Sequence, residues 1–436
     1  MGLSYQFTSK EVTPWGGMVF LKQFLDKVDF AGQVRSCGAL PQPGSNRGYA
    51  PETLLEAFVC SVWCGATKFI HTEQARSDRA LAGIFGWARV PAQDAYKRFF
   101  GKATAAGNLR VADHFFRWQI GCYRHDNLTV DFDSSVLTRY GGQEGARRGY
   151  NPQKRGRASH HPLIAFVNGL RLVANFWLRS GDTASSSNFL AFLDDTLAKF
   201  GDKRVGLARL DSGFCSGGIM GSLEGRGLDY IVAAKFTHPV QRLIAGSEAW
   251  LALDDGIEIC EKTYQADGWA APRRLVIVRQ EVASRPDAAG KGLPLFPGED
   301  FSRDYRYTAY FTSLGLPPAE VWRLYRMRGD AENRIKEIKH DFGFGCFSLK
   351  GFYATEAALI FVMVAYNLMS AFRMFVLQEK EQRRLCTLRW RTFAIGAYFQ
   401  KVNGCVVLMI ALTKKRRRWF ADLWDHPIAL PFFSNA

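Results

Sequence analysis

The segment Tyr325-Arg-Met-Arg-Gly-Asp-Ala-Glu-Asn-Arg-Ile-Lys-Glu-Ile-Lys339 carries polar side chains at steps of three and four residues. These side chains are Tyr325, Arg328, Glu332, Lys336 and Lys339. On a helix, this spacing places them on one face, which extends about 21 Å at helical rise. One carboxylate among cationic and phenolic groups is typical of a metal site beside a polyanion. The alternative is a solvated face on which Glu332 and Lys336 form an ordinary i,i+4 pair.

Two further acids lie upstream, each at the end of an apolar segment. Near residue 127 the hydrophobic pattern becomes alternating, and Leu128–Asp133 is predicted to be a strand that ends in acids. A second short strand, Val205–Leu210, is closed by Asp211. Between and after them we expect strands at His161–Asn168, Leu170–Leu178 and Asp229–Phe236, and a helix within Ser185–Phe200. This order places the acids at the ends of the first and fourth strands, and neighbouring strand ends lie about 5 Å apart. The sequence therefore predicts an α/β fold with a ribonuclease H-like core, a mixed sheet flanked by helices.

Asp133, Asp211 and Glu332 are the candidate catalytic residues and metal ligands. Two strand-end aspartates and a helical glutamate can hold two divalent ions about 3.5–4 Å apart. Oxygen ligands favour Mg²⁺, with Mn²⁺ as a substitute, over zinc. Taken singly, a strand-terminal aspartate is more often a turn or helix cap. Asp131 is a weaker rival of Asp133, because alternation puts both on one face of the strand.

The spacing Tyr325-x2-Arg328-x3-Glu332-x6-Lys339 resembles the Y-R-E-K signature of cut-and-paste DDE transposases of bacterial insertion sequences. Asp133-Ser134-Ser135 and Leu210-Asp211-Ser212-Gly213-Phe214 resemble the two aspartate motifs of that family. The segment from Tyr140-Gly141 to His161-Pro162 is similar to the insertion-sequence group numbered thirteen-eighty. The resemblance implies that Asp133, Asp211 and Glu332 bind metal and that Tyr325, Arg328 and Lys339 hold the DNA end. It also implies a β insertion before the glutamate-bearing helix.

The net charge of +16 is spread over the 436 residues and indicates a large anionic partner, nucleic acid before membrane. The nine cysteines have no zinc-type spacing, which suits a reducing cytoplasm, and the N-terminus has no signal-peptide pattern. The apolar stretch Ala357–Phe372 is interpreted as a buried helix too short to cross a bilayer.

We expect a division into five parts. These are a helical N-terminal DNA-binding or dimerisation domain (1–125), the core in two parts (126–236 and 305–377), a β-rich insertion (237–304) with a loop at Ala283–Asp300, and a basic C-terminal region (378–436). The insertion contains a predicted strand at Ala271–Gln280, and another at Tyr305–Thr312 leads to a helix expected to start near Pro318 and to contain the polar face. The N-terminal helices suit a helix-turn-helix module or a dimerisation bundle equally well.

The candidate DNA-contacting residues extend beyond the polar face. Lys154, Arg155 and Arg157 lie in a glycine-rich connection, and the basic run at 414–418 adjoins Trp419. Each group has a solvated surface as its alternative. Trp269 is a candidate for stacking on a base, with core packing as its alternative. His160 is assigned a capping or core role, with contact to the substrate as its alternative. The full set is Tyr325, Arg328, Lys336, Lys339, Lys154, Arg155, Arg157, Lys414, Lys415, Arg416, Arg417 and Trp269.

The sequence thus predicts a Mg²⁺-dependent transposase that binds the terminal inverted repeats of its element, cuts them and joins them to target DNA, as a homodimer on the DNA and without a membrane partner. Two alternatives remain: a transposase-derived DNA-binding protein without catalysis, and a structure-specific nuclease that cuts without joining.

Overall fold

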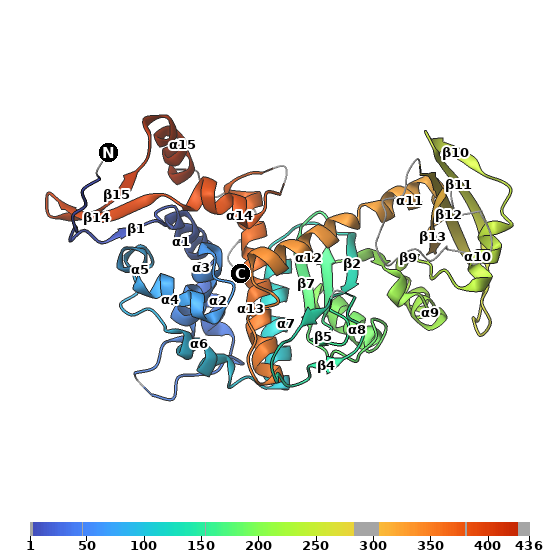
Figure 1. The fold of residues 1–436 in the computed structure, drawn as a ribbon, viewed down its shortest axis with the longest axis horizontal. Coiled ribbons are helices and arrows are strands. Elements are labelled where there is room, and N and C mark those ends of the chain that lie inside the picture. Colours follow the sequence, from blue (N-terminus) through green and yellow to red (C-terminus); the bar gives the residue numbers. More distant parts are fainter. Residues whose placement is uncertain (1–2, 46, 153, 283–304, 380–381, 426–436) are drawn as a thin grey trace.

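A computed structural model describes residues 3–45, 47–152, 154–282, 305–379 and 382–425 (Figure 1). The expected loop Ala283–Asp300 lies outside the described residues.

The N-terminal part is helical, as predicted. Its helices are α1 (Met18–Lys27), α2 (Phe30–Ser36), α3 (Pro51–Cys64), α4 (Thr72–Ser77), α5 (Arg79–Phe85), α6 (Gln93–Phe100) and α7 (Ala105–Gly121). Pro51 opens α3 at a position where its missing N–H costs nothing. Gly65 ends the helix with φ of 116°, which a side chain would oppose.

Within the described residues, the main sheet has nine strands in the order β10-β11-β12-β13-β9-β8-β2-β6-β7. The strands are β2 (Leu128–Ser134), β6 (Leu163–Val167), β7 (Leu172–Trp177), β8 (Val205–Leu210), β9 (Asp229–Ala233), β10 (Leu251–Asp254), β11 (Ile257–Tyr264), β12 (Arg273–Glu281) and β13 (Tyr305–Thr312). β2 runs parallel to β8 and antiparallel to β6, and β9 runs parallel to β8. The strands β10 to β13 pair antiparallel and extend the same sheet, so the segment expected to be β-rich continues the core sheet.

Helices cover both faces of the sheet, among them α8 (Phe189–Lys199), α9 (Gly217–Gly225), α10 (His238–Ala245) and α13 (Phe352–Ala371). Together, α13 and the π-helical turn Phe372–Val376 form a helix of 25 residues, so the expectation that this segment is too short to span a bilayer was wrong. Its length and composition suit a membrane span, but 83% of its apolar window is buried, and a core helix passes the same test. Among the described residues, a second candidate span arises only if α3 and Phe69–Ser77, which meet at a bend of 93°, are counted as one span.

The single helix expected from Pro318 onward is two helices, α11 (Pro318–Arg326) and α12 (Gly329–Asp341). The break has a tertiary cause. The Leu324 carbonyl accepts a hydrogen bond from the Arg209 guanidinium, and the Arg328 amide turns to the Tyr325 carbonyl at 2.9 Å. The polar face therefore begins on α11 and continues on α12, which runs across the molecule toward α14 (Leu385–Leu388) (Figure 1).

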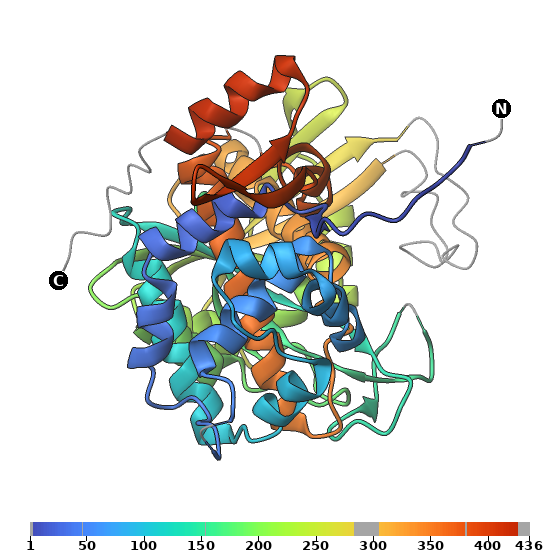
Figure 2. The ribbon, with the colours of Figure 1, turned by 90° about the vertical axis from the view of Figure 1, so that its left-hand side faces the viewer.

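A C-terminal hairpin, which the sequence analysis did not predict, lies against the N-terminal part. It consists of β14 (Gly396–Val402) and β15 (Cys405–Ala411), followed by α15 (Lys414–Asp425), and β14 pairs with β1 (Val12–Thr13). Figure 2 shows these C-terminal elements, in red, beside the blue N-terminal helices. Asn403 and Gly404 form the turn with φ of 50° and 82°. An Asn-Gly pair between two apolar runs is the sequence signal that identifies such a hairpin.

Candidate active site

The two strand-end aspartates lie side by side. Phe132 on β2 and Leu210 on β8 are direct partners in a parallel pair, and Asp133 and Asp211 are the next residues on their strands. Parallel neighbours are about 4.8 Å apart, so the register brings residues 78 positions apart in the chain to one edge of the sheet. The Asp211 side chain also accepts a hydrogen bond from the Gly213 amide at 2.8 Å, which caps the short turn that follows.

Asp131 is separated from this pair by its own counter-ion. Arg209 faces it from β8 and donates from Nε and Nη2 to its two carboxylate oxygens, at 2.5 and 2.7 Å. Both side chains are 1% exposed. A carboxylate whose oxygens are both engaged inside the sheet is not free to bind a ligand, so the preference for Asp133 over Asp131 has a structural reason.

Arg328 holds the glutamate-bearing helix against the first aspartate. Its Nη2 donates to Asp133 Oδ2 at 2.9 Å, and its Nη1 donates to Glu332 Oε1 at 3.3 Å. The residue is buried at the N-terminus of α12. The cation therefore bridges the acid on β2 and the acid on α12.

Tyr325 and Arg328 also bind the backbone immediately before each aspartate. The Tyr325 hydroxyl donates to the Leu210 carbonyl at 3.2 Å, and Arg328 Nη2 donates to the Phe132 carbonyl at 3.3 Å. The Tyr325 ring packs on Tyr310 of β13, with ring centroids 4.4 Å apart. Two residues of the polar face thus attach α11 and α12 to the ends of both acid-bearing strands.

The charges of the neighbouring groups act on the pKa of Asp133. Burial raises the pKa of Asp133; Arg328 opposes this rise, and the charges of Asp211 and Glu332 add to it, giving a pKa of about 6. For Arg328, burial alone would lower the pKa, but the neighbouring Asp133, Tyr325 and Asp211 outweigh it and the pKa is raised. These effects on Asp133 and Arg328 indicate that the charges of the three carboxylates and Arg328 act on one site.

Glu332 and the two lysines line the open side of α12. The Glu332 side chain is 56% exposed, Lys336 is exposed and Lys339 is half-buried. Burial lowers the pKa of Lys339, while the charge of Asp133 opposes the shift. An exposed carboxylate and two amines on one helical face suit contact with an anionic substrate.

The donor chemistry of the site fits a hard divalent cation, because all three candidate ligands are carboxylates. The side chains are not closed around one ion. Within the described ranges, no group of three or more His, Cys, Asp or Glu side chains is arranged to hold a metal. Glu332 instead bonds to Arg328, whose guanidinium supplies positive charge between it and Asp133.

A family model described as transposase DDE domain group 1 matches residues 2–426, which include all three acids. The chain belongs to this family. Among solved structures, the transposase is similar to a piggyBac transposase synaptic complex with hairpin DNA, at 12% sequence identity and a TM-score of 0.45. The similarity covers 88% of this chain and 81% of that chain. No curated protein sequence matches the transposase.

The other candidate DNA-contacting residues of the transposase lie on elements other than those that carry the acids. Lys154, Arg155 and Arg157 are exposed in the loop that precedes β5 (Ala158–His160). In α15, Lys414, Lys415 and Arg417 are exposed, and the half-buried Arg416 stacks over Trp419 with its guanidinium carbon 4.9 Å from the ring centroid.

Trp269 packs within the transposase rather than projecting from it. Its ring lies against Phe311 and Tyr264, with centroid distances of 5.0 and 5.7 Å, and the Arg273 guanidinium covers it at 5.2 Å. This placement matches the core-packing alternative.

Sequence reasoning missed Arg209 and Arg179. Both are buried arginines directed at the acid strand, since Arg179 donates to Ser134 Oγ at 3.3 Å. Arg209 was detectable, because an arginine in an otherwise apolar strand, two residues before a candidate ligand, needs a buried partner.

Proposed function

We propose that this transposase binds the terminal inverted repeats of an insertion sequence, cleaves the DNA ends and joins them to target DNA. It is of the cut-and-paste type with the Y-R-E-K signature, close to the group numbered thirteen-eighty, and its core is ribonuclease H-like. The strand order β7-β6-β2-β8-β9, with β8 and β9 parallel to β2, supports this core. The protein acts on double-stranded DNA in the cytoplasm, as a homodimer that bridges two ends.

The single observation that carries the proposal is the juxtaposition of Asp133 and Asp211 in register, with the charge of Glu332 acting on the same site. Asp133, Asp211 and Glu332 would hold Mg²⁺, or Mn²⁺ in its place. When bound, the metal supplies activation of the attacking water or 3′-hydroxyl and stabilisation of the leaving oxygen.

The side chains of this protein contribute binding and orientation. Lys336 and Lys339 present positive charge to the DNA backbone from the face of α12 that carries Glu332. Tyr325 and Arg328 fix that helix on the two strand ends and contact the DNA end from the same side. Lys154, Arg155, Arg157 and the basic side chains at the start of α15 extend the contact along the DNA.

The test uses purified protein, Mg²⁺ and a duplex that carries the end of the element. Cleavage followed by strand joining supports the proposal. Cleavage without joining identifies a structure-specific nuclease, and a gel shift without cleavage identifies a DNA-binding protein.

Glu332→Gln should abolish cleavage and leave DNA binding largely intact. Glu320→Gln is the matched control, because Glu320 is a half-exposed glutamate on α11 that also pairs with an arginine, Arg323, at 2.6 Å. Wild-type cleavage by Glu332→Gln would show that this glutamate is not a catalytic residue.

A further inference from the structure

Arg139 carries a buried charge for which the described residues provide no carboxylate partner. It is 4% exposed and follows β3 (Leu137–Thr138) directly. Its Nε donates to His160 Nδ1 at 3.0 Å and its Nη1 to the Gly345 carbonyl at 2.6 Å, while Nη2 is buried without a hydrogen-bond partner. The buried Arg209 and Arg373, in contrast, pair with Asp131 and Glu337. A buried cation without an anion is costly.

His160 holds this guanidinium without neutralising it. Burial lowers the pKa of His160 to about 4, so the ring is neutral at physiological pH. Nδ1 accepts from Arg139, and Nε2, at 2.9 Å from the Glu144 carbonyl, takes the role of donor. A neutral imidazole between a guanidinium and a carbonyl orients Arg139 and leaves its positive charge uncompensated.

Three more arginines surround the same space. A cavity of about 380 Å³ is lined by Arg139, Tyr140, Gly141, Arg148, Arg155, Gly156, Arg157 and Ala158. Every charged residue in this lining is an arginine. The exposed Tyr140 lies under Arg157, with the guanidinium carbon 5.8 Å from the ring centroid. Such a lining is complementary to phosphate, which arginine binds in a bidentate manner.

The cavity lies close to the candidate catalytic aspartates. Its lining comes from β4 (Arg147–Arg148) and β5 of the small sheet β3-β5-β4 and from the segments that connect these strands, beside the core sheet (Figure 1). The Ser135 amide bonds the Pro162 carbonyl at 3.1 Å, which fixes the start of this sheet beside the end of β2. Arg139 follows Asp133 by six positions, and such a segment spans at most about 20 Å.

We propose that this cavity is a phosphate-binding subsite for a DNA strand, within about six base pairs of the scissile bond. The identity of that bond rests on the proposed function. Arg148 comes from β4, and Arg155 and Arg157 come from the loop before β5. Arginines that belong to two separate segments suit successive phosphates of one strand rather than one small anion. Arg139 and Arg148 line the same cavity as Arg155 and Arg157 of the basic loop predicted from the sequence.

The test measures DNA affinity against salt concentration in EDTA, where no cleavage takes place. Arg148→Ala/Arg157→Ala removes two exposed side chains, so the fold should persist. Each lost phosphate contact lowers the magnitude of the slope of log K against log salt by about 0.9. The double variant should therefore reduce it by about 1.8.

The control Arg117→Ala/Arg323→Ala removes the same charge from two partly exposed arginines that already pair with Asp113 and Glu320. An equal slope for both double variants overturns the proposal.

A second measurement uses inorganic phosphate in place of chloride at equal ionic strength. Phosphate should raise the melting temperature of the wild-type protein and not that of Arg148→Ala/Arg157→Ala. A phosphate effect together with an unchanged DNA slope would identify a site for a small anion and also overturn the proposal. Because neither measurement requires cleavage, a protein that fails to cut DNA but shows the slope change retains the subsite and loses only the proposed function.

Discussion

Asp131 and Asp133 share one face of β2 and have opposite environments. Asp131 is enclosed with Arg209 inside the sheet, whereas Asp133, with its side chain 13% exposed, meets Arg328 at the edge. The sequence predicted the shared face from alternation alone. It did not predict the pairing, because the pairing depends on the register between strands that are far apart in the chain.

The two aspartates should therefore respond differently to the same substitution. Asp131→Asn leaves Arg209 buried without its counter-charge and should lower the free energy of unfolding by about 3–5 kcal/mol. Asp133→Asn should change stability little and abolish cleavage, since Arg328 keeps its contact with Glu332. Denaturant unfolding and a cleavage assay on both variants check this, and a stable Asp131→Asn protein would show that the buried pair is dispensable.

His160 makes the stability of the protein sensitive to acid. Its pKa is lowered by burial from an ordinary 6.5 to about 4, so between these values the unfolded chain binds a proton that the folded chain does not. The contribution of the neutral His160 to the free energy of unfolding is complete above about pH 6.5. It falls as the pH drops toward 4, by up to about 1.4 kcal/mol per pH unit.

Denaturant unfolding at pH 7 and pH 5 measures this dependence. In His160→Asn the fall should be smaller by the contribution of one proton, with the exposed His238→Asn as the matched control. An unchanged dependence in His160→Asn would show that the imidazole does not stay neutral in the fold.

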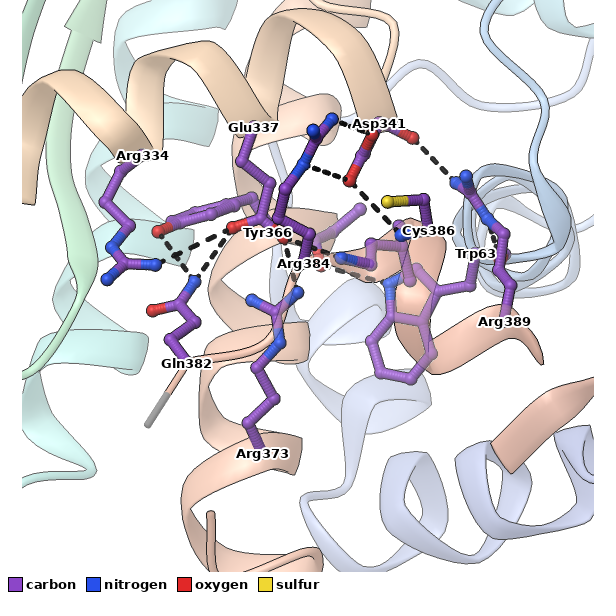
Figure 3. A network of polar contacts seen from close by, with 12 residues as sticks. Trp63, Arg334, Glu337, Asp341, Tyr366, Arg373, Gln382, Arg384, Cys386 and Arg389 are labelled. Atoms are coloured by element: carbon purple, nitrogen blue, oxygen red, sulfur yellow. Dashed lines mark hydrogen bonds and ion pairs between the residues drawn. The ribbon is translucent and has the colours of Figure 1, made fainter. Parts of the chain in front are cut away.

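At the scale of the element, α12 has two polar edges that contact different parts of the molecule. Glu332, Lys336 and Lys339 face the candidate active site. On another edge, Glu337 accepts a hydrogen bond from Arg373 at 2.5 Å (Figure 3). It accepts a second from the Leu385 amide at 2.8 Å. The periodicity of the sequence identified the first edge. The second has no short-range signal, because its partners lie on the π-helical turn after α13 and on α14.

Asp341, at the end of α12, continues this second edge. It bonds the Cys386 amide at 3.2 Å and Arg384 at 2.7 Å, and so caps the first turn of α14 together with Glu337 (Figure 3). Its carbonyl accepts from Arg389, which also bonds the Trp63 carbonyl of α3 at 2.8 Å. The helix that carries Glu332 is thereby fastened to the C-terminal region and the N-terminal helices.

A double-mutant cycle on Glu337 and Arg373 measures how strongly α12 is held to the π-helical turn that follows α13. Both side chains are almost fully buried. Glu337→Met should cost about 3–5 kcal/mol, because it leaves the buried guanidinium unpaired. Glu337→Met/Arg373→Met should recover most of that loss, since an apolar pair of similar size replaces two buried charges. Additive losses in denaturant unfolding would contradict direct pairing.

At the scale of the whole molecule, the two ends of the chain are folded together. β1 pairs with β14, and the Gly16 amide bonds the Ile395 carbonyl at 2.7 Å. On α1, Phe20 packs on Phe420 of α15 with ring centroids 4.7 Å apart. The sequence predicted helices at one end and a basic region at the other. Their association could not be predicted, because a two-residue strand such as β1 carries no detectable period.

Adding a single Cβ atom at Gly17 tests this association between the two ends of the chain. A Cβ at Gly17 would lie 2.0 Å from the Thr392 carbonyl oxygen and 2.8 Å from the Phe393 Cα, so the C-terminal segment approaches too closely for any side chain. The φ of Gly17 is −69°, an angle that alanine adopts freely, and therefore the cost of Gly17→Ala is purely the overlap. We expect a loss of about 1–3 kcal/mol in the free energy of unfolding. Gly38→Ala is the matched control, since a Cβ there meets nothing within 4 Å.

Limited proteolysis should in addition cleave the β14–β15 hairpin faster in Gly17→Ala than in Gly38→Ala, because the substitution displaces that hairpin from the N-terminal helices. Equal stability and equal cleavage in the two variants would mean that the chain ends fold independently.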